Sequence, residues 1–182
     1  MRSRTYKKGG IAIRLTKRAV LAAAAIAAGL LFAAPAPPAY ALGSVSMTTA
    51  RSATISGWTL VPSGANTRAA GSIGITATGP YLVTVSADRS RMTEYVTASA
   101  AYATTPKTLG AALSVLTTTT SGLGIATSSV SVGTSATTIA TGVTGTDAYS
   151  VSLSQPTAIT DRALASGRTY HIALTYTAST TV

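Results

Sequence analysis

The chain has 182 residues, carries a formal net charge of +10 at pH 7 and contains no cysteine. The lack of cysteine excludes a disulfide framework, a thiolate metal site and lipid attachment through a lipobox. Half of the 14 Lys and Arg residues lie in the first eighteen positions, so the strong positive charge belongs to the start of the chain.

The first 41 residues have the layout of a secretory signal peptide. Seven basic and no acidic residues come first, an apolar run follows at 19–34, and prolines at 35, 37 and 38 break any helix. Ala39-Tyr40-Ala41 supplies the small–x–small pattern that signal peptidase recognises. We therefore predict a signal peptide over 1–41, cleaved after Ala41, and a mature chain over 42–182.

Two other interpretations fit this segment less well. A retained membrane anchor needs roughly 20 apolar residues, whereas this run has 16. A prepilin-type leader cut after Gly10 would place Arg14, Lys17 and Arg18 inside a helix that has to be apolar. No stable transmembrane anchor is therefore expected.

Beyond residue 41 the charge is modest, since seven basic and four acidic residues leave +3. Nucleic-acid binding needs a basic stripe interleaved with stacking aromatics, so no nucleic-acid partner is expected. The basic residues are scattered along the sequence, and we interpret them as ordinary solvated surface. They are Arg51, Arg68, Arg89, Arg91, Lys107, Arg162 and Arg168.

Residues 42–182 have the length of one domain, with 141 residues. Thr and Ser make up more than a third of them, 31 positions being Thr, whereas Glu and Lys occur once each. Because Thr favours pleated sheet while Glu and Lys favour helix, this composition predicts an all-β fold. Short apolar-alternating segments predict about seven to nine strands in a single antiparallel, immunoglobulin-like β-sandwich.

The clearest strand lies at 167–178, where large and small residues alternate with period 2. The larger side consists of Tyr170, Ile172, Leu174 and Tyr176. The opposite side, expected to face outward, consists of His171, Ala173, Thr175 and Thr177. Burial of each larger residue would contribute about 1.5–3 kcal/mol, so this strand is expected at the centre of a sheet.

Shorter strands are expected along the rest of the mature chain, separated by Gly- and Pro-containing turns. Their ranges are 53–61, 71–77, 81–86, 94–102, 109–116, 124–132, 136–140 and 149–153. Gly79-Pro80 is a turn signal, and we expect the strands before and after it to pair as a hairpin. The threonine run at 117–121 is either a site for O-linked sugar or a solvated loop, and its composition favours the loop.

Two of these strands together resemble a known family. Gly79-Pro80-Tyr81-Leu82-Val83-Thr84-Val85, followed far downstream by the strand at 167–178, is similar to the layout of WxL-type surface domains of Gram-positive bacteria. In that family a Gly-Trp-x-Leu strand is paired with a closing G-x-Y-x-x-x-L-T-W-x-L strand. Here Tyr81 and Tyr176 stand at the tryptophan positions, and Ala178 stands at a leucine position. The resemblance implies an exported surface β-domain.

The residues that carry chemistry are few. His171 has no second His and no Cys to join it in a metal site, so a packed or surface role is expected. Of the carboxylates, Asp88 and Glu94 could form a glycosidase pair, and Asp88, Asp147 and Asp161, all expected in loops, could bind calcium with Glu94. Neither arrangement has the required pocket or spacing. No G-x-S-x-G motif is present, and Gly122-Leu123-Gly124 lacks the lysine and helix of a phosphate loop. We therefore predict no catalytic residues, no metal and no cofactor.

Trp58 is the candidate for stacking against a ligand, because aromatic side chains on an exported β-sandwich can form a platform for sugars. The tyrosines are expected mostly in the core and at its rim. A non-enzymatic, secreted structural or adhesive surface protein is therefore predicted. The alternatives are a carbohydrate-binding module and a subunit of a strand-exchanged surface assembly.

The expected partners are cell-wall glycan, other surface proteins or further copies of the chain. Few Lys, Glu or Pro residues are available to protect the sheet edges from pairing with another chain. The apolar-alternating segment at 42–47 is the candidate donor strand for such self-association.

Overall fold

The computed structural model describes residues 43–49, 54–55 and 57–181, which fall within one compact unit of the chain, Leu42–Val182. These residues contain twelve strands and no helix, which confirms the all-β prediction. A helix long and apolar enough to cross a bilayer is accordingly not found in this part of the chain. The predicted signal peptide and its cleavage position lie outside the described residues.

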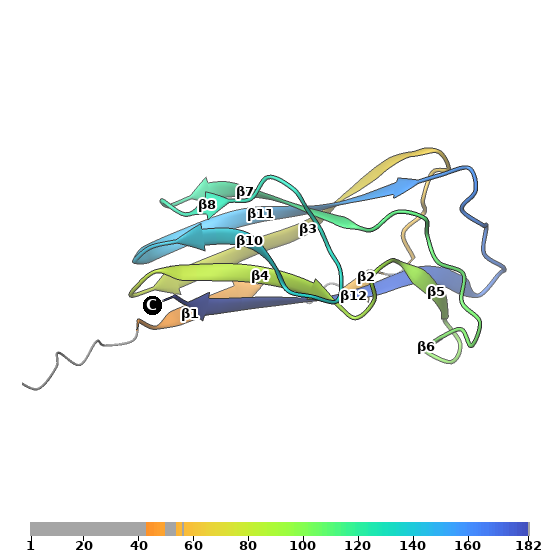
Figure 1. Cartoon of the computed structure of the whole chain (residues 1–182), viewed down its shortest axis with the longest axis horizontal. Coiled ribbons are helices and arrows are strands. Elements are labelled where there is room, and N and C mark those ends of the chain that lie inside the picture. The colour runs from red at the N-terminus through yellow and green to blue at the C-terminus, as the bar shows by residue number, and fades with distance from the viewer. Residues whose placement is uncertain (1–42, 50–53, 56, 182) are drawn as a thin grey trace, which may run out of the picture. The chain divides into compact units, whose positions relative to one another are not determined.

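The strands form two antiparallel sheets (Figure 1). The first has the order β1-β3-β11-β7-β9. Its strands are β1 (Val45–Thr49), β3 (Gly64–Ala77), β7 (Ser114–Ser121), β9 (Val130–Ser131) and β11 (Gly145–Thr157).

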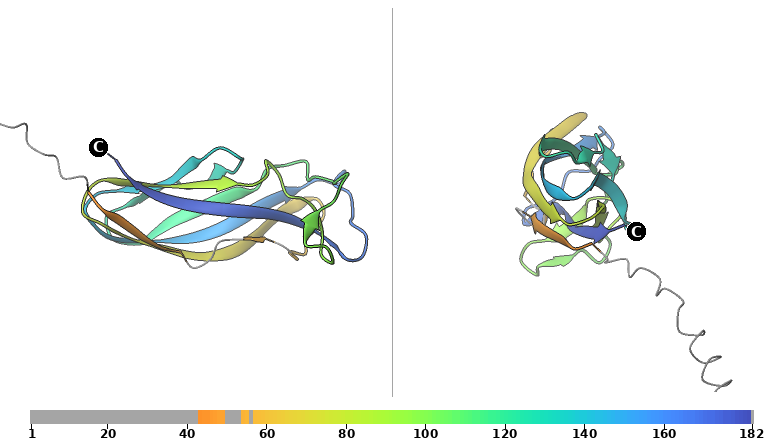
Figure 2. Two further views of the ribbon diagram at one scale, coloured as in Figure 1. Left: turned by 90° about the horizontal axis from the view of Figure 1, so that it is seen from below. Right: turned by 90° about the vertical axis from the view of Figure 1, so that its left-hand side faces the viewer.

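The second sheet has the order β6-β5-β12-β4-β10-β8, and β2 also pairs with β12. Its strands are β2 (Thr54–Ile55), β4 (Tyr81–Ala87), β5 (Thr93–Val96), β6 (Ala101–Tyr102), β8 (Ile125–Ala126), β10 (Thr137–Gly142) and β12 (Arg168–Thr180). The two sheets lie on either side of a shared interior (Figure 2).

Strand β12 is central to its sheet, as the alternation at 167–178 predicts. It pairs with β4 from Leu174 to Thr180, with β5 from Arg168 to His171, and with β2 at Ile172 and Ala173. Ile172 and Leu174 are buried, and Tyr170 and Tyr176 are half-buried against the core. Burial raises the pKa of the Tyr176 hydroxyl to about 12.

The outward side of β12 is not uniformly solvated. Thr175 and Thr177 are exposed as expected, but His171 is buried. The reason is a second layer of side chains, because Tyr95 of β5 stacks on the imidazole ring and Tyr102 of β6 meets it edge-on.

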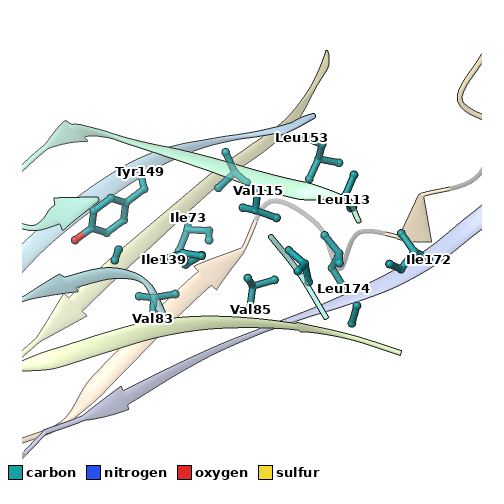
Figure 3. Packing of buried hydrophobic residues seen from close by; sticks show 14 of the residues in the cluster. Ile73, Val83, Val85, Leu113, Val115, Ile139, Tyr149, Leu153, Ile172 and Leu174 are labelled. Atoms are coloured by element: carbon teal, nitrogen blue, oxygen red, sulfur yellow. The ribbon is translucent and has the colours of Figure 1, made fainter. Parts of the chain in front are cut away.

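A single hydrophobic cluster draws on both sheets (Figure 3). Strands β3, β7 and β11 contribute Ile73, Val115 and Leu153 from one side, and β4 and β12 contribute Val85 and Leu174 from the other. Every second residue of β4 is buried, which is the pattern of a strand with one face on the core.

The predicted hairpin between 71–77 and 81–86 is wrong. Both segments are strands, but β3 lies in the first sheet and β4 in the second, so the turn at 78–80 connects the two layers. The backbone of β3 pairs with β1 and β11, and the backbone of β4 pairs with β10 and β12. The buried side chains of the two strands belong to one hydrophobic cluster, but the strands share no ladder.

The predicted first strand at 53–61 is wrong over most of its described length. A strand is present at Thr54–Ile55, whereas residues 57–61 form none. The side chain of Asn66 replaces a strand partner there, because its Oδ1 accepts the Val61 N–H at 2.6 Å and its Nδ2 donates to the Val61 carbonyl at 3.2 Å. Trp58 and Leu60 still pack against the core.

The threonine run at 117–121 is also not a loop, since it forms the second half of β7. Thr117 is buried, and its hydroxyl lies 2.7 Å from the Thr127 carbonyl oxygen and 3.0 Å from that of Ile139. Threonine hydroxyls thus connect β7 of the first sheet to the β8 and β10 segments of the second.

Of the remaining predicted strands, those at 81–86, 136–140 and 149–153 are present with shifted bounds, and that at 109–116 begins only at Ser114. The predicted single strand at 94–102 is wrong, because a turn at 97–100 divides it into β5 and β6, which pair with each other. That at 124–132 is wrong as well, since it consists of β8 and β9, which lie in different sheets.

The candidate donor segment at 42–47 is paired within its own chain in its described part. Val45 to Thr49 form β1, which pairs with β3 from Ala77 to Ile73. The structure therefore gives this segment a place in the edge of the first sheet of the same copy.

The described domain has two ends with different connections. The turn end carries the connections at 78–80 and 142–145, where Ala77 pairs with Gly145 and Tyr81 pairs with Gly142. The loop end carries strand β6 and the connections at 97–100, 103–113 and 158–167, since Thr157 pairs with Gly64 and Arg168 with Val96. The chain leaves the turn end at Thr181, whose N–H donates to the carbonyl of Pro80.

Candidate functional site

A groove of about 400 Å³ lies at the loop end, and Trp58 is part of its wall. The wall combines apolar and polar side chains from segments far apart in the sequence. They include Trp58, Leu60, Leu109, Asp161, Arg162, Leu164, Arg168 and Tyr170. The fold thus joins the stacking candidate Trp58 to the first large residue of the C-terminal strand, Tyr170.

Tyr170 is held rigidly in the groove wall. Its hydroxyl donates a hydrogen bond of 2.6 Å to the carbonyl of Arg162, which fixes the ring against the loop before β12. Burial raises the pKa of this tyrosine, and the negative charges of Asp161 and Glu94 raise it further. Tyr170 is therefore a neutral aromatic surface with one polar edge already satisfied.

Arg168 is oriented by a buried carboxylate. Its Nη1 lies 2.5 Å from Oε1 of Glu94, whose side chain is 3% exposed, whereas that of Arg168 is 42% exposed. The Lys107 N–H donates to the other oxygen of Glu94 at 2.9 Å. The hydrogen bond from Arg168, followed by that from Lys107, lowers the pKa of Glu94. The groove thus has a guanidinium of fixed position in its wall.

Asp161 connects two segments of the loop end through hydrogen bonds to their backbones. Its Oδ1 accepts the Gly110 N–H at 2.8 Å, and its Oδ2 accepts the Ala158 N–H at 2.7 Å. The segment before β7 is thereby fixed to the loop between β11 and β12. This carboxylate supports the groove and has both oxygens engaged.

Five of the described basic residues are exposed, as expected, and Lys107 is half-buried, but the fold does not scatter them evenly. Arg51 lies outside the described residues. Lys107, Arg162 and Arg168 lie at the loop end, and Arg89 and Arg91 lie in the connection between β4 and β5. The remaining described one, Arg68, pairs with Leu153 in the half of β3 that leads to the loop end. Among the described residues, the turn end carries no basic side chain.

The four carboxylates do not come together. Each has its own partners: Asp88 accepts the Tyr102 hydroxyl at 2.5 Å and the Ala173 N–H at 2.8 Å, and Glu94 and Asp161 are bound as described above. The described residues contain no group of three His, Cys, Asp or Glu side chains that could hold a metal. Asp88 and Glu94 are thus each engaged by separate partners, and the described residues bring no three of these side chains together as a calcium site would need.

His171 belongs to an aromatic cluster apart from the groove. Its ring is stacked on Tyr95 with centroids 4.1 Å apart, and Tyr102 lies edge-on at 5.4 Å. The guanidinium of Arg89 lies 4.3 Å above the Tyr102 ring. Burial lowers the pKa of His171, although the nearby Asp88 acts in the opposite direction. We interpret His171 as a neutral packing residue.

A second polar cluster lies at the turn end, and sequence reasoning missed it. Asp147 was expected in a loop, but it is a buried residue of β11. The Tyr81 hydroxyl donates to its Oδ2 at 2.5 Å and lies 2.6 Å from the Tyr149 hydroxyl. The Gly124 N–H donates to Oδ1 at 2.8 Å. The signal that could have found the cluster is the Asp147-x-Tyr149 alternation, which places both residues on one face of a strand.

The charge of Asp147 is stabilised by neutral donors. Burial raises the pKa of this carboxyl, but the hydrogen bonds from Tyr81 and from the N–H groups of Gly124 and Leu123 outweigh burial and lower it overall. For Tyr81 burial and the bond to Asp147 act in the same direction, so its pKa is strongly raised. The loop Gly122-Leu123-Gly124 therefore does bind an anion, and that anion is the protein's own aspartate.

Comparisons of the chain with protein-family models, with curated proteins and with solved structures find no match. The similarity to WxL-type domains therefore stays a prediction from the sequence pattern.

Proposed function

We propose that this chain is a non-enzymatic, exported surface protein whose single β-sandwich serves as a structural or adhesive module. The observation that carries this proposal is the groove at the loop end. Its wall combines aromatic, aliphatic, threonine and arginine side chains, and the one carboxylate among them, that of Asp161, accepts backbone N–H groups with both oxygens. Such a wall is suited to holding a partner, and its threonine hydroxyls have no histidine or free carboxylate in the same wall to act as a base.

An immunoglobulin-like arrangement is the form of sandwich that we propose. Two antiparallel sheets that share one hydrophobic cluster support it. The turn at 78–80 supports it as well, because a connection between opposite sheets is characteristic of sandwich topologies.

Export is supported by the basic and apolar layout of residues 1–41 and by the resemblance to WxL-type surface domains. The two strands that carry that resemblance, β4 and β12, pair directly, with Val85 opposite Tyr176.

The leader is tested by mass spectrometry of the protein recovered from the cell surface and the medium. We expect a mature N-terminus at Leu42, because Ala39-Tyr40-Ala41 is the cleavage pattern. Recovery of an intact N-terminus, or of a cut after Gly10, would contradict the proposed export route.

A carbohydrate-binding module is the second candidate function, and the shared position of Trp58 and Tyr170 in the groove favours it. Stacking of a sugar on Trp58 predicts specific binding on a glycan array. Trp58→Ala is then expected to weaken binding at least about tenfold, which corresponds to about 1.4 kcal/mol.

Trp58→Phe is the matched control for that array, because phenylalanine keeps an aromatic face at the same position. Binding that survives in Trp58→Phe and is lost in Trp58→Ala would establish the module. The absence of any glycan signal from the wild-type protein would remove this candidate and leave the structural role.

A further inference from the structure

Strands β5 and β6 form a short hairpin that pairs with the first residues of β12 (Figure 1). In the ladder between β5 and β12, Glu94 pairs with Tyr170 and Tyr95 pairs with Thr169. Directly paired residues share a face of a sheet, and successive residues of a strand point to opposite faces. Glu94 and Tyr170 therefore lie on one face of this ladder, and Tyr95 and His171 lie on the other. The first face belongs to the groove, whose wall includes Tyr170, and the second carries the aromatic cluster.

The groove face depends on the position of Glu94. Its buried carboxylate holds Nη1 of Arg168 at 2.5 Å, and Arg168 is part of the groove wall. The backbone of Glu94 is bonded to the rest of the loop end, because its N–H donates to the Lys107 carbonyl and its carbonyl accepts the Ala103 N–H. A displacement of β5 from β12 would therefore take the carboxylate away from the guanidinium that it orients.

The opposite face is filled by the imidazole of His171. This residue is 7% exposed, and its ring lies parallel to that of Tyr95 within 10° at a centroid distance of 4.1 Å. Tyr102 of β6 meets both rings edge-on. Among the described residues, Nδ1 of His171 is buried without a hydrogen-bond partner. The cluster thus holds the hairpin on β12 by packing against a neutral imidazole.

The carboxylate that acts on His171 is already engaged. Oδ1 of Asp88 accepts the Ala173 N–H at 2.8 Å, and Oδ2 accepts the Tyr102 hydroxyl at 2.5 Å. A protonated imidazole has two N–H donors, so a proton on His171 demands acceptors that this carboxylate has given to other partners. A buried charge without its hydrogen bonds destabilises the packing around it.

The other ionisable groups around the cluster do not supply a counter-charge. Arg89, whose guanidinium lies 4.3 Å from the Tyr102 ring centroid, adds a second cation, and exposed Arg91 follows in the same connection. Burial, followed by the bond to Asp88, raises the pKa of Tyr102, which stays neutral. Strand β2 pairs with the next residues of β12 and has no titratable side chain in its described part, Thr54–Ile55.

Acid is therefore expected to weaken this corner of the domain before the rest. Burial lowers the pKa of His171 although Asp88 opposes it, so an open hairpin takes up a proton more readily than the closed one. The stability that the neutral imidazole contributes is present above the ordinary histidine value of about 6.5 and is lost as the pH falls through that value toward the folded one. The loss stays local, since β5 pairs with β12 over four residues and with β6 over two.

We propose that His171 is an acid switch for the groove: a proton taken from solvent by its imidazole releases the β5–β6 hairpin from β12, and Arg168 is thereby freed from Glu94. The proposal rests on the binding role proposed above and adds its regulation. A groove that holds its partner at neutral pH loses its fixed guanidinium in mild acid. No covalent bond other than that to the transferred proton changes, so the switch is reversible.

The test is an NMR titration of the mature protein from neutral pH to about pH 5, where a histidine changes charge. The chain has one histidine and one tryptophan, so the ring signals of His171 and Trp58 are unambiguous. We expect the imidazole to titrate with a midpoint below about 6.5. The amide signals of β5 and β6 and the indole N–H of Trp58 in the groove are expected to shift with the same midpoint, while the amides of β11 stay unchanged. Glu94 keeps its charge in this range, because its pKa is lowered.

His171→Phe is the matched control, since phenylalanine keeps a ring for Tyr95 to stack on and takes up no proton. The shifts of β5, β6 and Trp58 between neutral pH and pH 5 are expected to disappear in this variant. If phenylalanine prevents folding, His171→Gln, which is polar and does not titrate, takes its place.

The proposal is overturned by an imidazole midpoint at or above the ordinary value, or by hairpin and Trp58 signals that do not follow the imidazole. It is also overturned by shifts that persist in the variant without a histidine. The titration needs no ligand and no export. A missing glycan signal or an intact leader would therefore leave these measurements unaffected, and the proposals fail separately.

Discussion

Leu174→Asp is expected to unfold the domain or to leave it barely stable at room temperature. Leu174 is 3% exposed, lies in the shared cluster and pairs with Ala87 of β4. A carboxylate at this position would be buried without a partner, which costs several kcal/mol out of the roughly 5–15 kcal/mol that stabilise a typical domain. Thermal melts followed by circular dichroism measure the loss.

Thr175→Asp is the matched control for this variant. Thr175 is the next residue of the same strand, is exposed and points to the other face of the sheet. Its replacement introduces the same charge, and we expect a change within about 0.5 kcal/mol. Equal and small losses in both variants would show that β12 is peripheral and would contradict its central place in the sheet.

The strand predicted at 167–178 is present as β12, whereas the hairpin predicted around 78–80 is wrong, and the two outcomes have different physical causes. The alternation at 167–178 is a local property, and four large residues on one side are enough to define which face is buried. The partner of a strand is a global property. Two strands joined by a short turn can pair in one sheet or face each other across the core, and β3 and β4 have the same buried alternation in either case.

Of the residues in the groove wall, Trp58 is the one that could be identified from the sequence as a candidate for ligand stacking. The other walls of the groove come from the segment before β7 and from the connection before β12, and nothing in their composition indicates that they meet. The hydrogen bonds of Asp161 to Gly110 and Ala158 bring them together. Side-chain to backbone bonds of this kind depend on the folded geometry, so a linear pattern does not reveal them.

Hydroxyl-rich segments were misinterpreted for a related reason. The polar side chains at 117–121 predict a solvated loop, yet Thr117 is buried with its hydroxyl close to two carbonyl oxygens. Threonine can be buried in a sheet when its hydroxyl has a hydrogen-bond acceptor, because its β-branched side chain favours strand geometry. In a chain so rich in threonine, polarity is a poor guide to exposure.

Asp147→Ala is expected to destabilise the fold by about 1–3 kcal/mol for each buried donor that is left without an acceptor. The Gly124 N–H and the Tyr81 hydroxyl would lose their acceptor, and the loop that carries Leu123 would lose its support. Urea unfolding at neutral pH measures the loss. We expect Asp147→Asn to be milder, because an amide oxygen can still accept the Gly124 N–H while Tyr81 turns its hydroxyl toward Tyr149.

The pH dependence of the same variants tests the ionisation of Asp147. Although burial opposes it, the hydrogen bonds from Tyr81, Gly124 and Leu123 lower the pKa of this carboxyl in the folded state. A lowered pKa stabilises the fold at pH values above the ordinary value of about 3.9, and this contribution is lost as the pH falls through that value toward the folded one. The wild-type advantage over Asp147→Asn is therefore expected to shrink in acid. An advantage that stays constant from neutral pH into acid would mean that Asp147 is protonated throughout, and the tyrosine hydroxyls would then be bound to a neutral acid.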